Sequence, residues 1–133
     1  MAEAKPVTKA KKKKAKRTVA RGQLHVYASF NNTIISFTDE QGNLLASSSA
    51  GACGFRGSKK GTAYAAQVAS EKAGQIAKSQ YGLNKVDVFI KGIGLGRDAA
   101  VRALNGLEIM IDSISDVTGL AHGGVRPRKA RRV

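Results

Sequence analysis

The positive charge of this 133-residue chain is concentrated at its two ends. Residues 1–23 carry nine Lys and Arg side chains against one acid, and residues 119–133 carry five against none. The intervening residues 24–118 hold nine basic and eight acidic groups and are nearly neutral. A segment dense in like charges and poor in large apolar groups cannot bury enough surface to offset its conformational entropy. The sequence therefore limits the hydrophobic core to one central domain.

Three segments follow from this charge pattern. Residues 1–21 are rich in Lys and Ala and are predicted to be a disordered basic arm. Residues 22–118 are predicted to form a globular α/β body, and residues 119–133 a basic C-terminal tail. The formal net charge of +14 is more than solubility requires, and it indicates a polyanionic partner such as a nucleic acid.

Several classes of protein are disfavoured by composition. Cys53 is the only cysteine, so neither an intramolecular disulfide nor a cysteine-based metal site can form. The basic N-terminus is not followed by the apolar stretch of a secretory signal, and no apolar run approaches membrane-spanning length. We expect an intracellular soluble protein without metal, cofactor or membrane partner.

Apolar periodicity gives the order of elements. Alternating runs predict strands, and a run of alanines at helical spacing predicts a helix that packs closely on a sheet. The resulting order, β-β-β-α-β-α-β, is that of the ribonuclease H-like fold, with an antiparallel meander, right-handed crossovers and helices packed on a mixed sheet. The predicted strands are 24–30, 33–39, 44–51, 85–92 and 109–118, and the predicted helices are 63–82 and 97–108.

Two glycine-rich loops precede the predicted helices. The loop 92–96 fails the dinucleotide-binding pattern because Arg97 occupies the third-glycine position, and neither loop contains the Gly-Lys-Ser/Thr of a P-loop. Both loops lead into helix N-termini, which attract anions. With its three cations Arg56, Lys59 and Lys60, the first loop is interpreted as a phosphate contact. For 92–96, a phosphate contact and a tight turn remain equally open.

The alternative function is a metal-dependent nuclease of the same fold. Such an enzyme needs clustered carboxylates, one of them on the first strand, and residues 24–30 contain none. Glu71 and Asp87 can be read as remnants of a metal site, but solvated charges are the simpler interpretation. A generic DNA-compacting protein would explain the basic ends but not the neutral body with its loops. We therefore expect no enzymatic activity.

Five motifs in a fixed order resemble the bacterial form of the ribosomal protein S11 family. They are ASFNNTIISFTD, SSAGACGFRGSKKGT followed by AAQVA, IKGIGLGRDAAVRAL, DVT, and the terminal RPRKARRV. The resemblance spans residues 18–133. The chain departs from the family where Ile93 and Leu95 replace the usual prolines, and where Gly123 replaces the Asn of the usual Asn-Gly step in the tail.

The resemblance implies a structural protein of the small ribosomal subunit, located in the cytoplasm within the ribosome. It implies binding and bridging of 16S rRNA helices in the platform, next to the cleft that holds the Shine–Dalgarno duplex of mRNA. The implied protein partners are small-subunit ribosomal proteins seven and eighteen and initiation factor three. The residues expected to contact RNA are Lys11, Lys12, Lys13, Lys14, Arg17, Arg21, Asn31, Asn32, Arg56, Lys59, Lys60, Arg97, His122, Arg126, Arg128, Lys129, Arg131 and Arg132.

Overall fold

A computed structural model describes residues 18–132 of the chain. Within this range, five strands form one sheet in the order β3-β2-β1-β4-β5. The β1–β2 and β2–β3 pairs are antiparallel, whereas the β1–β4 and β4–β5 pairs are parallel. The strands are β1 (Arg21–Ala28), β2 (Thr33–Asp39), β3 (Leu44–Ser49), β4 (Lys85–Gly92) and β5 (Met110–Asp116). The α/β class, the mixed sheet and the predicted element order are confirmed.

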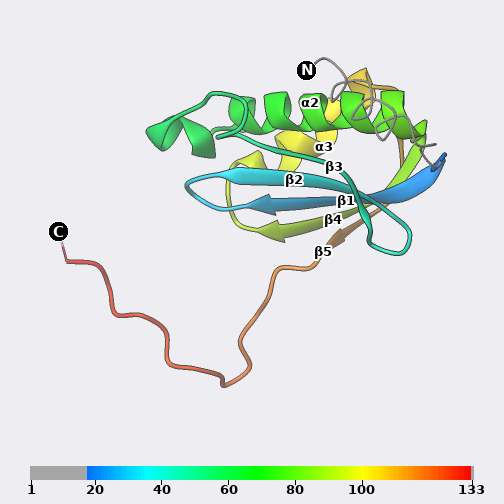
Figure 1. Ribbon diagram of the computed structural model, residues 1–133. Helices are drawn as coiled ribbons and strands as arrows, with labels where there is room; N and C mark the ends of the chain where they lie inside the picture. The colour runs from blue at the N-terminus through cyan, green and yellow to red at the C-terminus, as the bar shows by residue number, and fades with distance from the viewer. Residues whose placement is uncertain (1–17, 133) are drawn as a thin grey trace, which may run out of the picture.

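The helices are η1 (Gly57–Gly61), a short 3-10 helix, and the two α-helices α2 (Ala63–Tyr81) and α3 (Gly96–Gly106). Both α-helices lie on the same face of the sheet, with α2 over β2 and β3 and α3 over β1 and β4 (Figure 1). Thr62 begins α2, because its hydroxyl accepts a hydrogen bond from the Ala65 amide. Gly82 ends the helix in the left-handed conformation, with φ of 68°, which glycine adopts readily.

The core lies between the helices and the inner face of the sheet. Strand residues such as Leu24, Phe37 and Val88 are fully buried there. The buried positions of α2 are all small residues, which lets its backbone approach the sheet and α3 closely, while Ile76 packs half-buried against the core. The buried residues of α2 are Ala65, Ala66, Ala69, Ser70, Ala73, Gly74 and Ala77.

Helix α3 ends two residues earlier than the sequence predicts. The reason is that Glu108 adopts a left-handed φ of 61°, which no α-helix can contain. Leu107 thereby turns toward the core, and its carbonyl accepts a hydrogen bond of 2.6 Å from Lys78 Nζ on α2. No helix in the described part of the chain is long and apolar enough to span a membrane.

Candidate nucleic-acid interface

Most of the predicted RNA-contacting residues of the body lie at one end of the sheet. Strands β1, β4 and β5 are parallel, so their carboxyl ends meet at the same edge. We call this edge the loop end and define it by residues 29–32, 50–62, 93–97 and 117–118. The β1–β2 turn, the connection through η1 and the start of the C-terminal tail all emerge there (Figure 1).

The loops of the loop end pack backbone against backbone. The Gly94 amide donates a 2.9 Å hydrogen bond to the Ala28 carbonyl. A Cβ added at Gly94 would lie 2.2 Å from the Ser29 carbonyl oxygen, and one added at Gly61 would lie 2.1 Å from that of Phe30. Because real Cβ atoms do not approach so closely, both positions require glycine. This packing gives the loop 92–96 a structural reason for its glycines that is independent of any phosphate.

The connection between β3 and α2 carries cations that make no ion pair with the residues the structure describes. Arg56 Nη1 donates to the carbonyls of Gly51 and Phe55, at 2.8 and 3.0 Å, and so stays bound to its own loop. Lys59 and Lys60 form the last turn of η1, and among residues 18–132 neither they nor Arg56 makes an ion pair. Such a loop attracts a polyanion.

Helix α2 adds to the positive potential of this loop. Its first turn contains no acidic residue, so the partial positive charge of its N-terminus is not compensated by its own sequence. Lys59 and Lys60 stand directly before this helix end, where a cation is electrostatically unfavourable. A bound phosphate would relieve both effects at once.

The two asparagines of the β1–β2 turn serve different purposes. Asn32 Oδ1 accepts a 2.8 Å hydrogen bond from the Thr33 amide, and the Asn32 carbonyl accepts one from the Ser29 amide at 2.9 Å. These bonds hold the turn closed. Asn31 is exposed beside it. The turn therefore presents Asn31 to solvent and uses Asn32 to fix its own shape.

Arg97 lies in the first turn of α3 and bonds to other groups of the protein. Its Nη1 donates to the Gly92 carbonyl at 3.0 Å, and its Nη2 donates to Asp116 Oδ2 at 2.7 Å. The guanidinium has five N–H groups, so these two bonds leave others for a phosphate. Its predicted RNA contact stays a prediction, and the observed bonds tie Arg97 to the end of β5.

The predicted RNA-contacting residues of the tail are all exposed. Residues 117–132 leave β5 and run away from the body in an irregular path (Figure 1). His122 and the five basic residues 126, 128, 129, 131 and 132 share this exposure. The predicted contacts Lys11, Lys12, Lys13, Lys14 and Arg17 lie outside the described residues.

Arg21 lies at the opposite end of the sheet, at the start of β1. It pairs with Glu40, Asp87 and Asp112, with nitrogen–oxygen distances of 3.3, 3.2 and 2.5 Å. The hydrogen bond and charge of Asp112 raise the pKa of Arg21, and the bond from Arg21 lowers the pKa of Asp112. Three carboxylates neutralise the Arg21 guanidinium, so Arg21 differs from the predicted contacts of the loop 50–62, which make no ion pair within residues 18–132.

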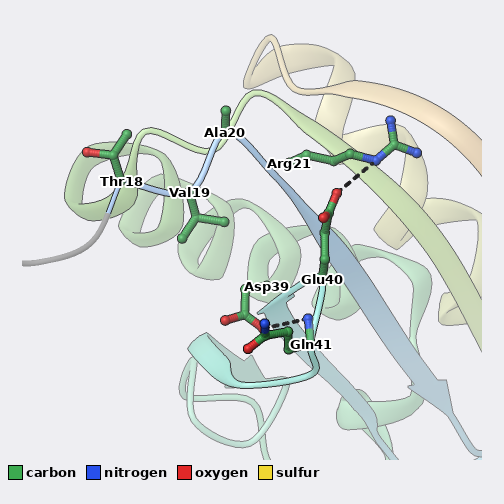
Figure 2. A pocket seen from close by; sticks show the side chains of 7 residues that line it. All are labelled: Thr18, Val19, Ala20, Arg21, Asp39, Glu40 and Gln41. Atoms are coloured by element: carbon green, nitrogen blue, oxygen red, sulfur yellow. Dashed lines mark hydrogen bonds and ion pairs between the residues drawn. The ribbon is translucent and has the colours of Figure 1, made fainter.

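A surface pocket adjoins Arg21 and is also remote from the loop end. Thr18–Arg21 line one side of it and Asp39–Gln41 the other, with the Arg21–Glu40 pair drawn across it (Figure 2). Val19 on this rim donates its amide to the Tyr81 carbonyl at 2.8 Å and packs against the core. The pocket therefore lies between the residues that lead into β1 and the turn that follows β2.

The geometry does not assemble the carboxylate site of the nuclease alternative. Asp87 projects from the helix-free face of the sheet and is paired with Arg21. Glu71 lies on α2, which covers the other face. Within residues 18–132, no group of three or more His, Cys, Asp or Glu side chains can hold a metal ion.

Two functional candidates at the loop end escape sequence reasoning. Asp116 ends β5 and accepts a hydrogen bond from Arg97 at the start of α3, and Thr118 accepts one from the amide of Gly92 in the glycine loop. The only local signal is the Asp-Val-Thr run after a strand, since Asp and Thr side chains commonly bond to nearby backbone. Their partners, Gly92 and Arg97, cannot be read from that run.

Comparison with known proteins gives matches over nearly the whole chain. The family model described as ribosomal protein S11 matches residues 22–132. Small ribosomal subunit protein uS11 of Teredinibacter turnerae is 55% identical over 130 residues, covering 98% of this chain and 99% of the relative. The same-named proteins of Cellvibrio japonicus and Burkholderia cenocepacia are 56% and 57% identical, covering 98% and 92% of this chain and 99% and 91% of the relatives. The chain belongs to the ribosomal protein S11 family.

Proposed function

We propose that this protein is a structural constituent of the small ribosomal subunit that binds 16S rRNA through its loop end and its two basic extensions. The observation that carries the proposal is the loop 50–62. It holds three cations, no ion pair within the described residues, and the uncompensated N-terminus of α2. Phosphate contacts of this kind give affinity and position without reading base sequence.

The finer placement is proposed from the family resemblance. On that basis the protein bridges 16S rRNA helices in the platform and lines the cleft that holds the Shine–Dalgarno duplex. Small-subunit proteins seven and eighteen and initiation factor three are its proposed neighbours. A neutral body with separate basic surfaces suits such a bridge, because each surface can neutralise a different RNA helix.

The test compares two double variants of the full chain, each of which lowers the net charge by two. Lys59→Ala/Lys60→Ala removes cations from the loop end, and Lys72→Ala/Arg102→Ala removes exposed cations from α2 and α3. Affinity for a 16S rRNA fragment covering the platform is measured against salt concentration. The slope of log affinity against log salt should fall by about 1.5 units for the loop variant, since each phosphate contact contributes roughly 0.7–0.9.

The helix variant serves as the matched control and should keep nearly the full slope. Equal losses in the two variants would mean that only net charge matters, and the proposed interface at the loop end would be wrong. Sedimentation of each tagged variant with small ribosomal subunits from bacterial lysate then reports incorporation. A wild-type chain that sediments apart from the subunits would overturn the ribosomal role itself.

A further inference from the structure

A closed ring of hydrogen bonds joins the start of the C-terminal tail to the glycine loop. Thr118 Oγ1 donates to Asp116 Oδ1 at 2.5 Å and accepts from the Gly92 amide at 3.1 Å. Asp116 Oδ2 accepts from Arg97 Nη2 at 2.7 Å, and Arg97 Nη1 donates to the Gly92 carbonyl at 3.0 Å. The ring therefore runs through Gly92, Thr118, Asp116 and Arg97 and returns to Gly92. We call these four residues the clasp.

The backbone at Gly92 makes the ring possible. Its φ of 103° lies in a region that favours glycine, and a Cβ there would lie 2.1 Å from the Ala28 carbonyl oxygen. In this conformation the amide of Gly92 bonds to Thr118 while its carbonyl accepts from Arg97. One residue at the end of β4 thus bonds both to the tail and to α3.

The clasp is also the last attachment of the tail to the body. The Val117 amide donates to the Ile90 carbonyl at 2.8 Å, which extends the pairing of β5 with β4 by one residue. Beyond Thr118, residues 119–132 are exposed throughout and make no hydrogen bond or ion pair with other described residues. The point from which the tail leaves the body must therefore be fixed by contacts of residues 116–118.

We propose that Arg97, Asp116 and Thr118 are positioning residues that fix the point from which the basic tail departs, so that its five cations reach one particular stretch of rRNA backbone. The proposal rests on the proposed role of the tail in RNA binding. A chain whose root is already ordered loses less conformational entropy when it binds, and affinity rises without any added contact. The bonds from Thr118 and Arg97 favour the ionised carboxylate of Asp116 and hold its pKa at about 2, below its ordinary value of 3.8.

Three variants separate this role from simple electrostatics. Thr118→Val removes the ring hydroxyl without changing charge, and Asp116→Asn removes a negative charge that by itself would repel RNA. Both should weaken binding of the full chain to the 16S rRNA platform fragment by about fivefold or more, the scale of ordering one further residue. Arg97→Ala should weaken binding by a similar factor in addition to the loss seen for Arg102→Ala. The Arg102 variant is the control because it removes an equal charge from the same helix.

Amide hydrogen exchange at Gly92, Val117 and Thr118 reports whether the ring has opened. Faster exchange together with weaker RNA binding supports the proposal. Unchanged exchange in the Thr118→Val and Asp116→Asn variants overturns it, and so does wild-type or tighter RNA binding despite faster exchange. A chain lacking residues 119–133 provides the reference: if it binds as tightly as the full chain, the proposed role of the tail fails and this inference fails with it.

Discussion

Residues in the loop 92–96 alternate between two environments, which explains its unusual run of small and large side chains. A Cβ at Gly92, Gly94 or Gly96 would meet Ala28 O, Ser29 O or Thr33 Oγ1 at 2.1, 2.2 and 2.3 Å. The intervening Ile93 and Leu95 are 62% and 73% exposed. Every second residue therefore packs against the body while the others face solvent. Close approach, rather than a nucleotide, accounts for the glycine spacing.

At the residue scale we predict that Gly94→Ala destabilises the protein. The added methyl group meets the carbonyl oxygen of Ser29, which is backbone and cannot rotate away. Overpacking of this kind costs about 1–3 kcal/mol in the free energy of unfolding. The measurement is urea denaturation followed by circular dichroism.

Gly106→Ala is the matched control for this substitution. Gly106 lies in α3, and a Cβ there meets no atom within 4 Å. Replacing a helical glycine of this kind should leave stability unchanged or raise it by about 0.5–1 kcal/mol. If Gly94→Ala proved as stable as Gly106→Ala, close packing would not be the reason for glycine at position 94.

At the scale of elements, local pattern predicts what lies within one strand or helix. The bounds of β2 and β4 match their predicted ranges, because apolar alternation is a strictly local signal. The buried face of α2 was less predictable. The larger apolar residues Val68 and Ile76 are only half-buried, whereas Ser70 and Gly74 are buried. The burial of Ser70 depends on α3, since Ser70 Oγ donates to the Ala100 carbonyl at 2.7 Å. Gly74 is set by the residue after α3, since a Cβ there would lie 2.4 Å from Leu107 Cδ1.

The candidate site shows the same limit more clearly. Composition and loop position led directly to Arg56, Lys59 and Lys60. The pairing of Arg97 with Asp116 depends on β5 lying beside β4, and that of Arg21 with Asp87 on β1 lying beside β4. Such contacts follow from topology, so a charge pattern alone cannot divide the cations into internally paired and unpaired ones.

The clasp also predicts how stability depends on pH. The folded-state pKa of Asp116 is about 2, below its ordinary value of 3.8, so the native state binds fewer protons than the unfolded state. The stabilisation is complete above about pH 4 and is lost as the pH falls toward 2. Asp116→Asn should therefore flatten this part of the stability profile, and Thr118→Val should flatten it less.

Thermal denaturation between pH 2 and 6 measures this effect. Asp112 also has a lowered pKa and is retained in both variants, so part of the acid dependence should remain. An Asp116→Asn profile that is parallel to the wild-type profile throughout this range would show that the carboxylate makes no stabilising contact in solution.

At the scale of the whole molecule, cations are divided between two tasks. In the body, four cations make ion pairs with carboxylates, namely Arg21, Lys78, Lys85 and Arg97. Those of the loop 50–62 and of the described tail make none within residues 18–132. The first group pairs with Glu40, Asp87, Glu108, Asp112 and Asp116, and the second is available to an external polyanion.

Removing the extensions should therefore reduce RNA binding without unfolding the body. A deletion of residues 1–17 takes away eight cations but keeps Val19, which bonds to Tyr81, and a deletion of residues 119–133 takes away five but keeps Thr118. Melting temperatures should stay within a few degrees of wild type, because little apolar surface is lost. The salt dependence of binding to the 16S rRNA platform fragment should fall in both, and further for the N-terminal deletion.

The doubly truncated chain, residues 18–118, tests what the body contributes alone. Its formal net charge is only +2, so a protein that bound RNA through overall charge would lose nearly all affinity. Because Arg56, Lys59 and Lys60 remain together beside the N-terminus of α2, we expect weak but measurable binding that disappears on adding Lys59→Ala/Lys60→Ala. Loss of all binding in the truncated chain itself would show that the loop end needs the extensions to hold RNA. Binding that survives the added substitutions would place the body's RNA contact elsewhere on its surface.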